Sequence, residues 1–531
     1  MPEYSVQEIV AMCQDYQNKN SELRTQWEDD YGLYRLTPFE IDIAEGKYED
    51  VTANSPSVLI DKIVEYLTDA TLKFHTVLQA KDTQGKKAKG SLNEQFAYAM
   101  NEKAEDWWQR YPLHKSLQAE TAFCATWAGL ICRRVYLWEK EGEVIPDVAV
   151  WLPQNTSWGT GENGLAWAAY KRYIPLAEAK ELYGDELTET KENIVVWDWW
   201  DKTYEKVIIE DKIIEQKEHK LGYPPVYIKA IGATPYMHGL KYTDVSKDWA
   251  EGVLKHNRSL YPIENRIASY YLTTVALGVK PPQVLWTLGG TPDSPFEANP
   301  YRAKGVISID STQFKSIEEF IKPTMPQDVS AFQNWFAGKL NTGGLPPISY
   351  GDAERIQTLG GLNLLNHNAM TTLKPRKKAV ELCYDWTIKE FVNQYKNKKF
   401  KALELDGLDE SDKQYTVSID AGKLDEKQRI KTELMLNLPT DEVSNAGVVD
   451  LLVKGGLYSR QRGMDKMGVE DPDAELAVQR MEKWMDNPEV SLPLAAADAV
   501  KHKNYDLAKR LLAIMEQQEE QQEEQTSQGQ S

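Results

Sequence analysis

Two aspartates stand among tryptophans in the stretch Trp197-Asp-Trp-Trp-Asp201. This composition could serve carbohydrate chemistry, because glycoside hydrolysis uses two carboxylates about 5 to 10 Å apart across a cleft. The spacing argues against a shared cleft, since residues three apart in a β-strand point to opposite faces. A carbohydrate-active enzyme that uses Asp198 and Asp201 is therefore kept as an alternative.

Other kinds of catalytic or metal site lack their sequence patterns. The chain has no Gly-x-x-x-x-Gly-Lys-[Ser/Thr] loop, no Gly-x-Ser-x-Gly turn and no His-Glu-x-x-His pair. The 4 cysteines include no Cys-x-x-Cys pair, and we expect them to be buried, reduced thiols. We therefore predict no catalytic residue, no metal site and no cofactor.

A polar loop between two predicted helices is the stretch around which the chain is organised. A helix is expected over Gln327–Leu340, and a long second helix after the pair Gly360-Gly361. Pro375 removes one hydrogen bond from the second helix and should bend it. The intervening loop, Ser349–Leu359, carries the candidate functional residues Asp352, Glu354, Arg355, Ile356 and Gln357.

Four basic side chains follow on the long helix: Lys374, Arg376, Lys377 and Lys378. They could contact DNA phosphates, which bind cationic side chains without reading sequence. The alternative is a solvated helix face, or charges that pair with an acidic neighbouring subunit. We favour the alternative.

A further helical segment and a strand-bearing insert precede the loop. The pattern predicts a helix over Asp244–Leu277, with a kink or restart at Pro262, and an insert between Pro281 and Met325. Short strands are expected in the insert at Gln283–Leu288 and Gly305–Ile309.

The remaining chain alternates helical and strand-like stretches. Helices are expected in Ser5–Tyr34, after Pro56, in Leu92–Trp127, in a short piece ending at Gly184, and from Leu424 onward; strands are expected at Leu130–Trp138, Ile194–Trp200, Lys206–Glu210 and Tyr415–Ile419.

The net charge of −19 argues against a protein that binds nucleic acid tightly by neutralising its phosphates. The charge is compatible with a channel through which DNA passes. Acidic side chains that line such a channel would repel the phosphate backbone and prevent tight binding. No apolar run approaches the roughly 20 residues that span a bilayer, so we expect no membrane contact. No signal peptide is visible at the N-terminus, which favours assembly in a cytoplasm.

The order of these pieces resembles that of portal proteins, the head-to-tail connectors of tailed bacteriophages. The similarity covers roughly residues 8–484 and is carried by many short motifs in order. They are Arg24-x-x-Trp27-x-x-x-Tyr31-x-x-Tyr34, Thr342-Gly-Gly-Leu-Pro346, Gly351, Gly360-Gly361, and Thr372-Leu-Lys-Pro375 with Glu381.

The resemblance implies an α+β, portal-like fold. Its parts would be an α+β wing (residues 1–243, returning at 401–437), two stem helices (244–279 and 326–341), a clip (280–325), a tunnel loop (342–361), a long kinked helix (362–400), a helical crown (438–515) and a disordered tail (516–531).

The resemblance also implies a function without catalysis. The chain would form a dodecameric ring at one vertex of the capsid in the virion, assembled in the host cytoplasm, and pass double-stranded DNA during packaging and ejection. Implied partners are the large terminase, the major capsid and scaffolding proteins, and head-completion or tail adaptor proteins. The clip residues expected to face terminase and adaptor are Gln283, Trp286, Phe296, Tyr301 and Arg302. A structural scaffold ring without a DNA channel is the other alternative.

Overall fold

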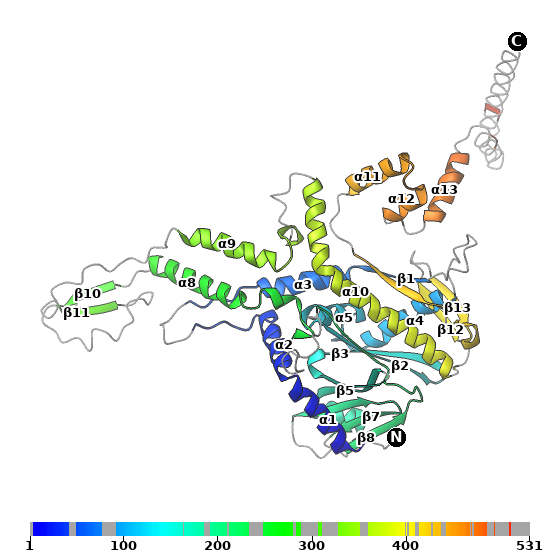
Figure 1. The fold of residues 1–531 in the computed structure, drawn as a ribbon, viewed down its shortest axis with the longest axis horizontal. Helices are drawn as coiled ribbons and strands as arrows, with labels where there is room; N and C mark the ends of the chain where they lie inside the picture. The colour runs from blue at the N-terminus through cyan, green and yellow to red at the C-terminus, as the bar shows by residue number, and fades with distance from the viewer. Residues whose placement is uncertain are drawn as a thin grey trace, which may run out of the picture. The chain divides into compact units, whose positions relative to one another are not determined.

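The computed structural model describes most of the chain as a mixture of helices and strands (Figure 1). The described ranges are 4–41, 49–76, 92–184 (without 163), 192–209, 212–232, 248–279, 283–287, 306–310, 328–350, 359–425 (without 399, 401–402 and 409–413), 428–436, 442–485 (without 468 and 470–471), 493 and 509–510. The chain divides into a larger unit, residues 1–409 and 414–439, and a smaller unit, residues 410–413 and 440–531.

A three-stranded antiparallel sheet lies at the centre of the larger unit's main core. The strand order is β3-β2-β9, with β2 at Leu130–Lys140, β3 at Glu143–Trp151 and β9 at Val226–Ala230. The first four residues of β2 are all buried, because helices cover the sheet. The predicted strand at Leu130–Trp138 is confirmed.

A five-stranded antiparallel sheet, in the order β4-β5-β6-β7-β8, follows in the chain. Its strands are β4 Thr156–Gly161, β5 Gly164–Pro175, β6 Asn193–Trp200, β7 Tyr204–Ile209 and β8 Lys212–Glu218. The strands predicted at Ile194–Trp200 and Lys206–Glu210 correspond to β6 and β7. The short helix α6, Leu176–Tyr183, ends as predicted at Gly184, whose φ of 97° favours glycine.

The helices before and after these sheets supply the rest of the core. They are α1 Val6–Lys19, α2 Ser21–Tyr34, α3 Ser55–Thr68, α4 Leu92–Gln109, α5 Leu117–Trp127 and α10 Leu359–Asn397. Helix α10 packs on β2 and α4 packs on β3. The prediction of helices in these regions is confirmed.

The chain returns to the larger unit after α10. The strands β12, Leu403–Leu408, and β13, Gln414–Ile419, form an antiparallel pair. The prediction of a helix from Leu424 is wrong, because β14, Ile430–Met435, pairs antiparallel with β1, Thr71–Thr76. Thr432 and Leu434 are buried with one exposed residue between them, which is the periodicity of a strand.

The helical pair and the insert occur in the predicted order. Helix α8 is Tyr261–Val279, the parallel strands β10 and β11 are Gln283–Thr287 and Val306–Asp310, and helix α9 is Asp328–Thr342. Both insert strands and the helix near residues 327–340 are confirmed.

Two helix boundaries differ from the predictions. Within the described residues from 248 on, α8 begins only at Tyr261, because a one-turn 3₁₀ helix, Val253–His256, precedes it. Gly252 lies so close to the core that an added Cβ would be 1.7 Å from the carbonyl oxygen of Trp127. The second difference is at α10, which begins at Leu359 and includes Gly360 and Gly361.

The smaller unit contains three described helices: α11 Glu442–Lys454, α12 Arg460–Lys466 and α13 Pro472–Met485. They correspond to the short helices predicted for residues 438–515. The tail at residues 516–531 lies outside the described residues. In the part of the chain that is described, no helix combines the length and apolar character that crossing a membrane requires.

Candidate functional site

The predicted loop residues Asp352, Glu354, Arg355, Ile356 and Gln357 lie outside the described residues. The structure describes the elements on either side of them. Helix α9 ends at Thr342 and a 3₁₀ turn, Pro347–Tyr350, follows; α10 begins at Leu359. These described elements fix where the loop begins and ends.

The turn after α9 is held against the larger unit's core. An added Cβ at Gly343 would lie 2.1 Å from Oδ1 of Asn257, so only glycine permits this approach. The Nδ2 group of Asn257 donates to the carbonyl oxygen of Leu340 over 2.7 Å. Leu345 is fully buried, and the Tyr66 hydroxyl donates to the carbonyl oxygen of Ser349 over 3.3 Å. The start of the loop is thus fixed by packing and hydrogen bonds.

An extended segment before α3 is hydrogen-bonded along α8. Side chains four residues apart on the helix accept from alternate backbone amides of the segment: Asn265 from Ala53 over 2.8 Å, Ser269 from Val51 over 2.8 Å and Thr273 from Glu49 over 2.9 Å. The spacing of the amides along the segment matches the spacing of the side chains along the helix. Two residues of extended chain rise about 6.6 Å, and four residues of helix rise about 6 Å. The sequence did not predict this contact, although Asn265, Ser269 and Thr273 stand four residues apart and so share one face of α8.

A buried ion pair anchors the chain just before α8. Asp30 is fully buried on α2, and its two oxygens lie 2.6 and 2.8 Å from Nε and a terminal nitrogen of Arg258. Nearby, the Ser55 hydroxyl donates to Glu264 over 2.7 Å. Burial raises the pKa of Glu264, and the serine hydrogen bond offsets part of that rise.

The start of α8 and the end of α9 line one cavity of about 290 Å³. Its walls come from three helices and the turn after α9, and they include Val58, Leu59, Tyr261, Leu340, Leu345 and Tyr350. The two helices that flank the insert therefore leave the core at a common place.

Helix α10 is anchored over the part that follows Pro375. Pro375 lies inside the helix, and Figure 1 shows the ribbon of α10 changing direction part-way along. Beyond it, Val380, Tyr384 and Phe391 are among the buried core residues. Gln394 accepts from the amide of Leu137 and donates to the carbonyl oxygen of Val135, each over 2.8 Å. The part of α10 that follows Pro375 is thus tied to β2.

The four basic residues do not form one exposed face. Lys374 and Lys378 are exposed, Lys377 is half-buried, and Arg376 is only 8% exposed, so Arg376 lies neither on a DNA-facing surface nor on the solvated helix face of the favoured alternative. Burial lowers the pKa of Arg376 to about 10. Lys377 and Lys378 lie 3.7 and 3.1 Å from the carboxylate of Glu381. Two of the four charges are therefore paired within their own helix.

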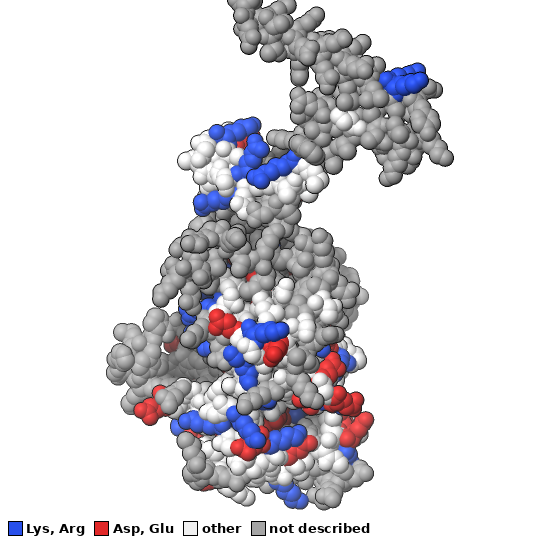
Figure 2. All heavy atoms as spheres, turned by 90° about the vertical axis from the view of Figure 1, so that its right-hand side faces the viewer, with Lys and Arg blue, Asp and Glu red and all other residues white. Residues whose placement is uncertain are grey.

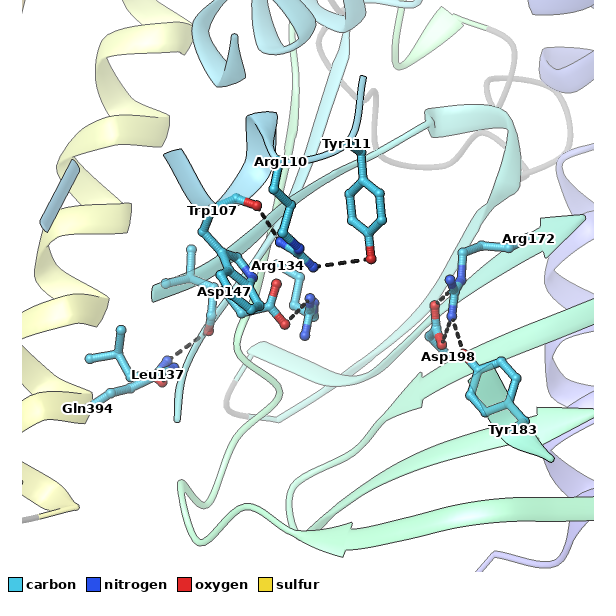
Figure 3. A network of polar contacts seen from close by, with 11 residues as sticks. Trp107, Arg110, Tyr111, Arg134, Leu137, Asp147, Arg172, Tyr183, Asp198 and Gln394 are labelled. Carbon is cyan, nitrogen blue, oxygen red and sulfur yellow. Dashed lines mark hydrogen bonds and ion pairs between the residues drawn. The ribbon is translucent and has the colours of Figure 1, made fainter. Parts of the chain in front are cut away.

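The two aspartates of the enzyme alternative have structural contacts. Asp198 forms a two-point ion pair with Arg172 at 2.7 and 2.9 Å, and Arg172 also donates to the Tyr183 hydroxyl (Figure 3). Asp201 accepts from the amides of Thr203 and Tyr204, each over 2.7 Å, where the chain turns between β6 and β7. Asp201 lies beyond the last residue of β6, in the turn, so the alternation of side chains along a strand does not apply to this pair; each carboxylate has its own partners.

Two of the five predicted clip residues lie within the described residues. Gln283 and Trp286 belong to β10, while Phe296, Tyr301 and Arg302 lie outside the described residues. All four cysteines are buried free thiols, as predicted. Among the described residues no group of three or more His, Cys, Asp or Glu side chains is placed to hold a metal ion.

Comparisons with known proteins include a distant likeness to a solved structure. No family model and no curated protein matches this chain. A chain from the neck of an empty GTA particle, computed with C6 symmetry, is similar to it at 10% sequence identity. The match covers 83% of this chain and 94% of that chain, with a TM-score of 0.38. A likeness this distant carries no argument about fold or function, which rest on the residues of this chain.

Proposed function

We propose that this chain is a portal protein, the head-to-tail connector of a tailed bacteriophage. Copies of it close into a dodecameric ring at one capsid vertex, and double-stranded DNA passes through the centre during packaging and ejection. The proposal is supported chiefly by two helices, α8 and α9. The start of α8 and the end of α9 line the same cavity, and both helices have large apolar side chains that are exposed.

The exposed side chains on these helices are what a subunit contact requires. On α8, Tyr270, Tyr271 and Val275 are 36%, 45% and 42% exposed, and on α9 Phe332 and Trp335 are 44% and 55% exposed. Contiguous exposed apolar surface marks an interaction site in a protein that folds in water. A closed ring uses two different surfaces of each subunit, one meeting the other on its neighbour. In this proposal the exposed faces of α8 and α9 supply those two surfaces.

The loop between α9 and α10 supplies the narrowest part of the channel. The turn that precedes it is anchored by Asn257 and Tyr66, and the helix that follows it is anchored beyond Pro375, at Gln394. The mixed charges of residues 352–357 suit transient contact with a phosphate backbone, whereas a strongly basic ring would bind the phosphates and slow DNA movement. The net charge of −19 acts in the same direction.

The insert between α8 and α9 is the proposed docking site for terminase and then for tail adaptor proteins. The major capsid and scaffolding proteins are the other proposed partners. Chemical energy for packaging comes from ATP hydrolysis on the terminase, and this chain is proposed to act mechanically, without a catalytic site.

Electron microscopy of the purified chain in negative stain tests the ring. We expect rings with a central hole. A compact monomer would favour the carbohydrate-active enzyme, and a solid or filamentous assembly would favour the scaffold without a channel.

Charged substitutions test which surface closes the ring. Tyr271→Glu with Trp335→Glu should leave subunits unassembled, because each buries a carboxylate in the subunit contact. Tyr173→Glu is the matched control, since Tyr173 is 58% exposed on β5 and distant in sequence from both helices. Rings that form equally well in all three proteins would refute the proposed contact.

Shortening the loop tests the channel. Deletion of residues 352–357 should leave rings intact and reduce the DNA packaged or retained in particles. Particles with normal genome content would contradict the assignment of this loop.

A further inference from the structure

The cavity of about 290 Å³ between α3, the start of α8 and the end of α9 opens at the surface of the larger unit. Val58 and Tyr350, which line it, are 38% and 40% exposed, and apolar side chains form much of its wall. Glu264 lines it as well, and among the described residues no cation pairs with this carboxylate. The volume is far above the roughly 10–15 Å³ that one water molecule needs. The cavity therefore has room for a side chain of several carbon atoms.

The turn between α4 and α5 presents apolar side chains to solvent. Leu113 is 94% exposed, more than any other large apolar residue that the structure describes, and Tyr111 is 46% exposed. Pro112, between them, is exposed too. We call residues 111–113 the apolar turn. Contiguous exposed apolar surface of this kind marks an interaction site.

The apolar turn is held in one conformation by its neighbours. The amide of His114 donates to the carbonyl oxygen of Tyr111 over 3.0 Å, which closes a β-turn. The guanidinium carbon of Arg110 lies 3.7 Å from the ring centre of Trp107 and 4.4 Å from that of Tyr111 (Figure 3). The ring of His114 stacks on Trp108 at 3.9 Å between centres. A group that is already ordered loses little conformational entropy on binding, which favours its use in a contact.

The apolar turn and the cavity are associated with opposite ends of α3. Val58, in the first turn of α3, lines the cavity. At the other end, Gln118, which follows the apolar turn in α5, donates to the carbonyl oxygens of Leu67 and Thr68 over 2.7 and 3.2 Å. A helix of 14 residues is about 21 Å long. One copy therefore carries the two features on different surfaces, which is what a head-to-tail contact between copies requires.

We propose that the apolar turn of one copy enters this cavity on the next copy, with Leu113 against the cavity wall. The inference rests on the proposed ring and adds a second contact to that of α8 and α9. Charge favours the same pairing, because Arg110 and Lys115 flank the turn and Glu264 lines the cavity. Figure 2 shows basic and acidic side chains interspersed on the described surface of the larger unit, so charge alone does not select a partner. The fit of an apolar side chain into a cavity supplies that selection.

Disulfide trapping in the full-length chain tests the contact directly. Val58→Cys with Leu113→Cys places one thiol in the cavity wall and one on the turn, and the four native cysteines are buried. A disulfide forms only where the two Cα atoms come within about 7 Å. Oxidation should therefore link copies into a ladder of covalent oligomers on a non-reducing gel. Val58→Cys with Leu182→Cys is the matched control and should give no ladder, since Leu182 is 51% exposed on α6.

Leu113→Asp tests what the contact contributes to assembly. The change removes apolar burial and places a carboxylate beside Glu264, so the subunit concentration at half assembly should rise by about tenfold or more in sedimentation velocity. The midpoint of urea unfolding should not change, because Leu113 is exposed in the single copy. Leu182→Asp makes the same change at another exposed leucine and should alter neither measurement.

Two outcomes would overturn the inference. They are the absence of a ladder from Val58→Cys with Leu113→Cys, and assembly of Leu113→Asp equal to that of the wild type. Closed rings in the wild type together with either of these results would remove this contact and leave the portal proposal in place. A ladder from a protein that forms open filaments instead of rings would support the contact and count against the portal proposal.

Discussion

Gln394 offers the sharpest test of how the long helix α10 is anchored. Strand β9 pairs with β2 only as far as Arg134, so the edge of β2 beyond that residue needs other partners. Gln394, which is fully buried, supplies them through its contacts with Leu137 and Val135 (Figure 3). Gln394→Leu removes both hydrogen bonds and keeps nearly the same volume.

The expected loss follows from the two backbone groups left unsatisfied. Each costs about 1–3 kcal/mol when buried without a partner. Burial of the leucine side chain returns about 1–2 kcal/mol. The free energy of unfolding should therefore fall by about 1–4 kcal/mol. Urea unfolding followed by tryptophan fluorescence measures this, and hydrogen exchange of peptides from β2 should show faster exchange around Leu137.

Gln109→Leu is the control for this experiment. Gln109 lies exposed at the end of α4, and its change should alter the free energy of unfolding by no more than about 0.5 kcal/mol. Equal stability of the two variants, with unchanged exchange in β2, would refute the role assigned to Gln394.

Three further predictions follow from the larger unit. Asp30→Ala should lower the free energy of unfolding by about 3–5 kcal/mol, because it leaves the Arg258 charge unpaired, whereas the exposed neighbour Asp29→Ala should change it little in the same urea titration. Burial lowers the pKa of Lys398 from 10.5 to about 8. Between pH 8 and pH 10.5 the unfolded chain therefore holds a proton on Lys398 that the folded chain has lost, so the contribution of this group to the free energy of unfolding rises with pH. Urea unfolding at pH 7.5 and 9.5 should show this rise in the wild type but not in Lys398→Met. In the native protein none of the four buried thiols should react with a thiol reagent at pH 8, and all four should react after unfolding; rapid native reaction would contradict their burial.

The sequence by itself determined the elements whose signals are local. The helix that ends at Gly184, the hairpin of β6 and β7, and the order of α8, insert, α9 and α10 all follow from residue periodicity and from glycine and proline positions.

Only the tertiary structure decided the features that depend on distant partners. Ile430–Met435 is a strand because Thr71–Thr76 lies beside it, and nothing within the stretch itself fixes that pairing. Arg376 belongs to a basic sequence, yet it is buried because the fold covers that side of α10. The contacts of Asn257 with Leu340 and of Gln394 with β2 join residues far apart in the chain. Local patterns fix secondary structure, while burial and partner choice depend on packing between segments that the sequence does not place side by side.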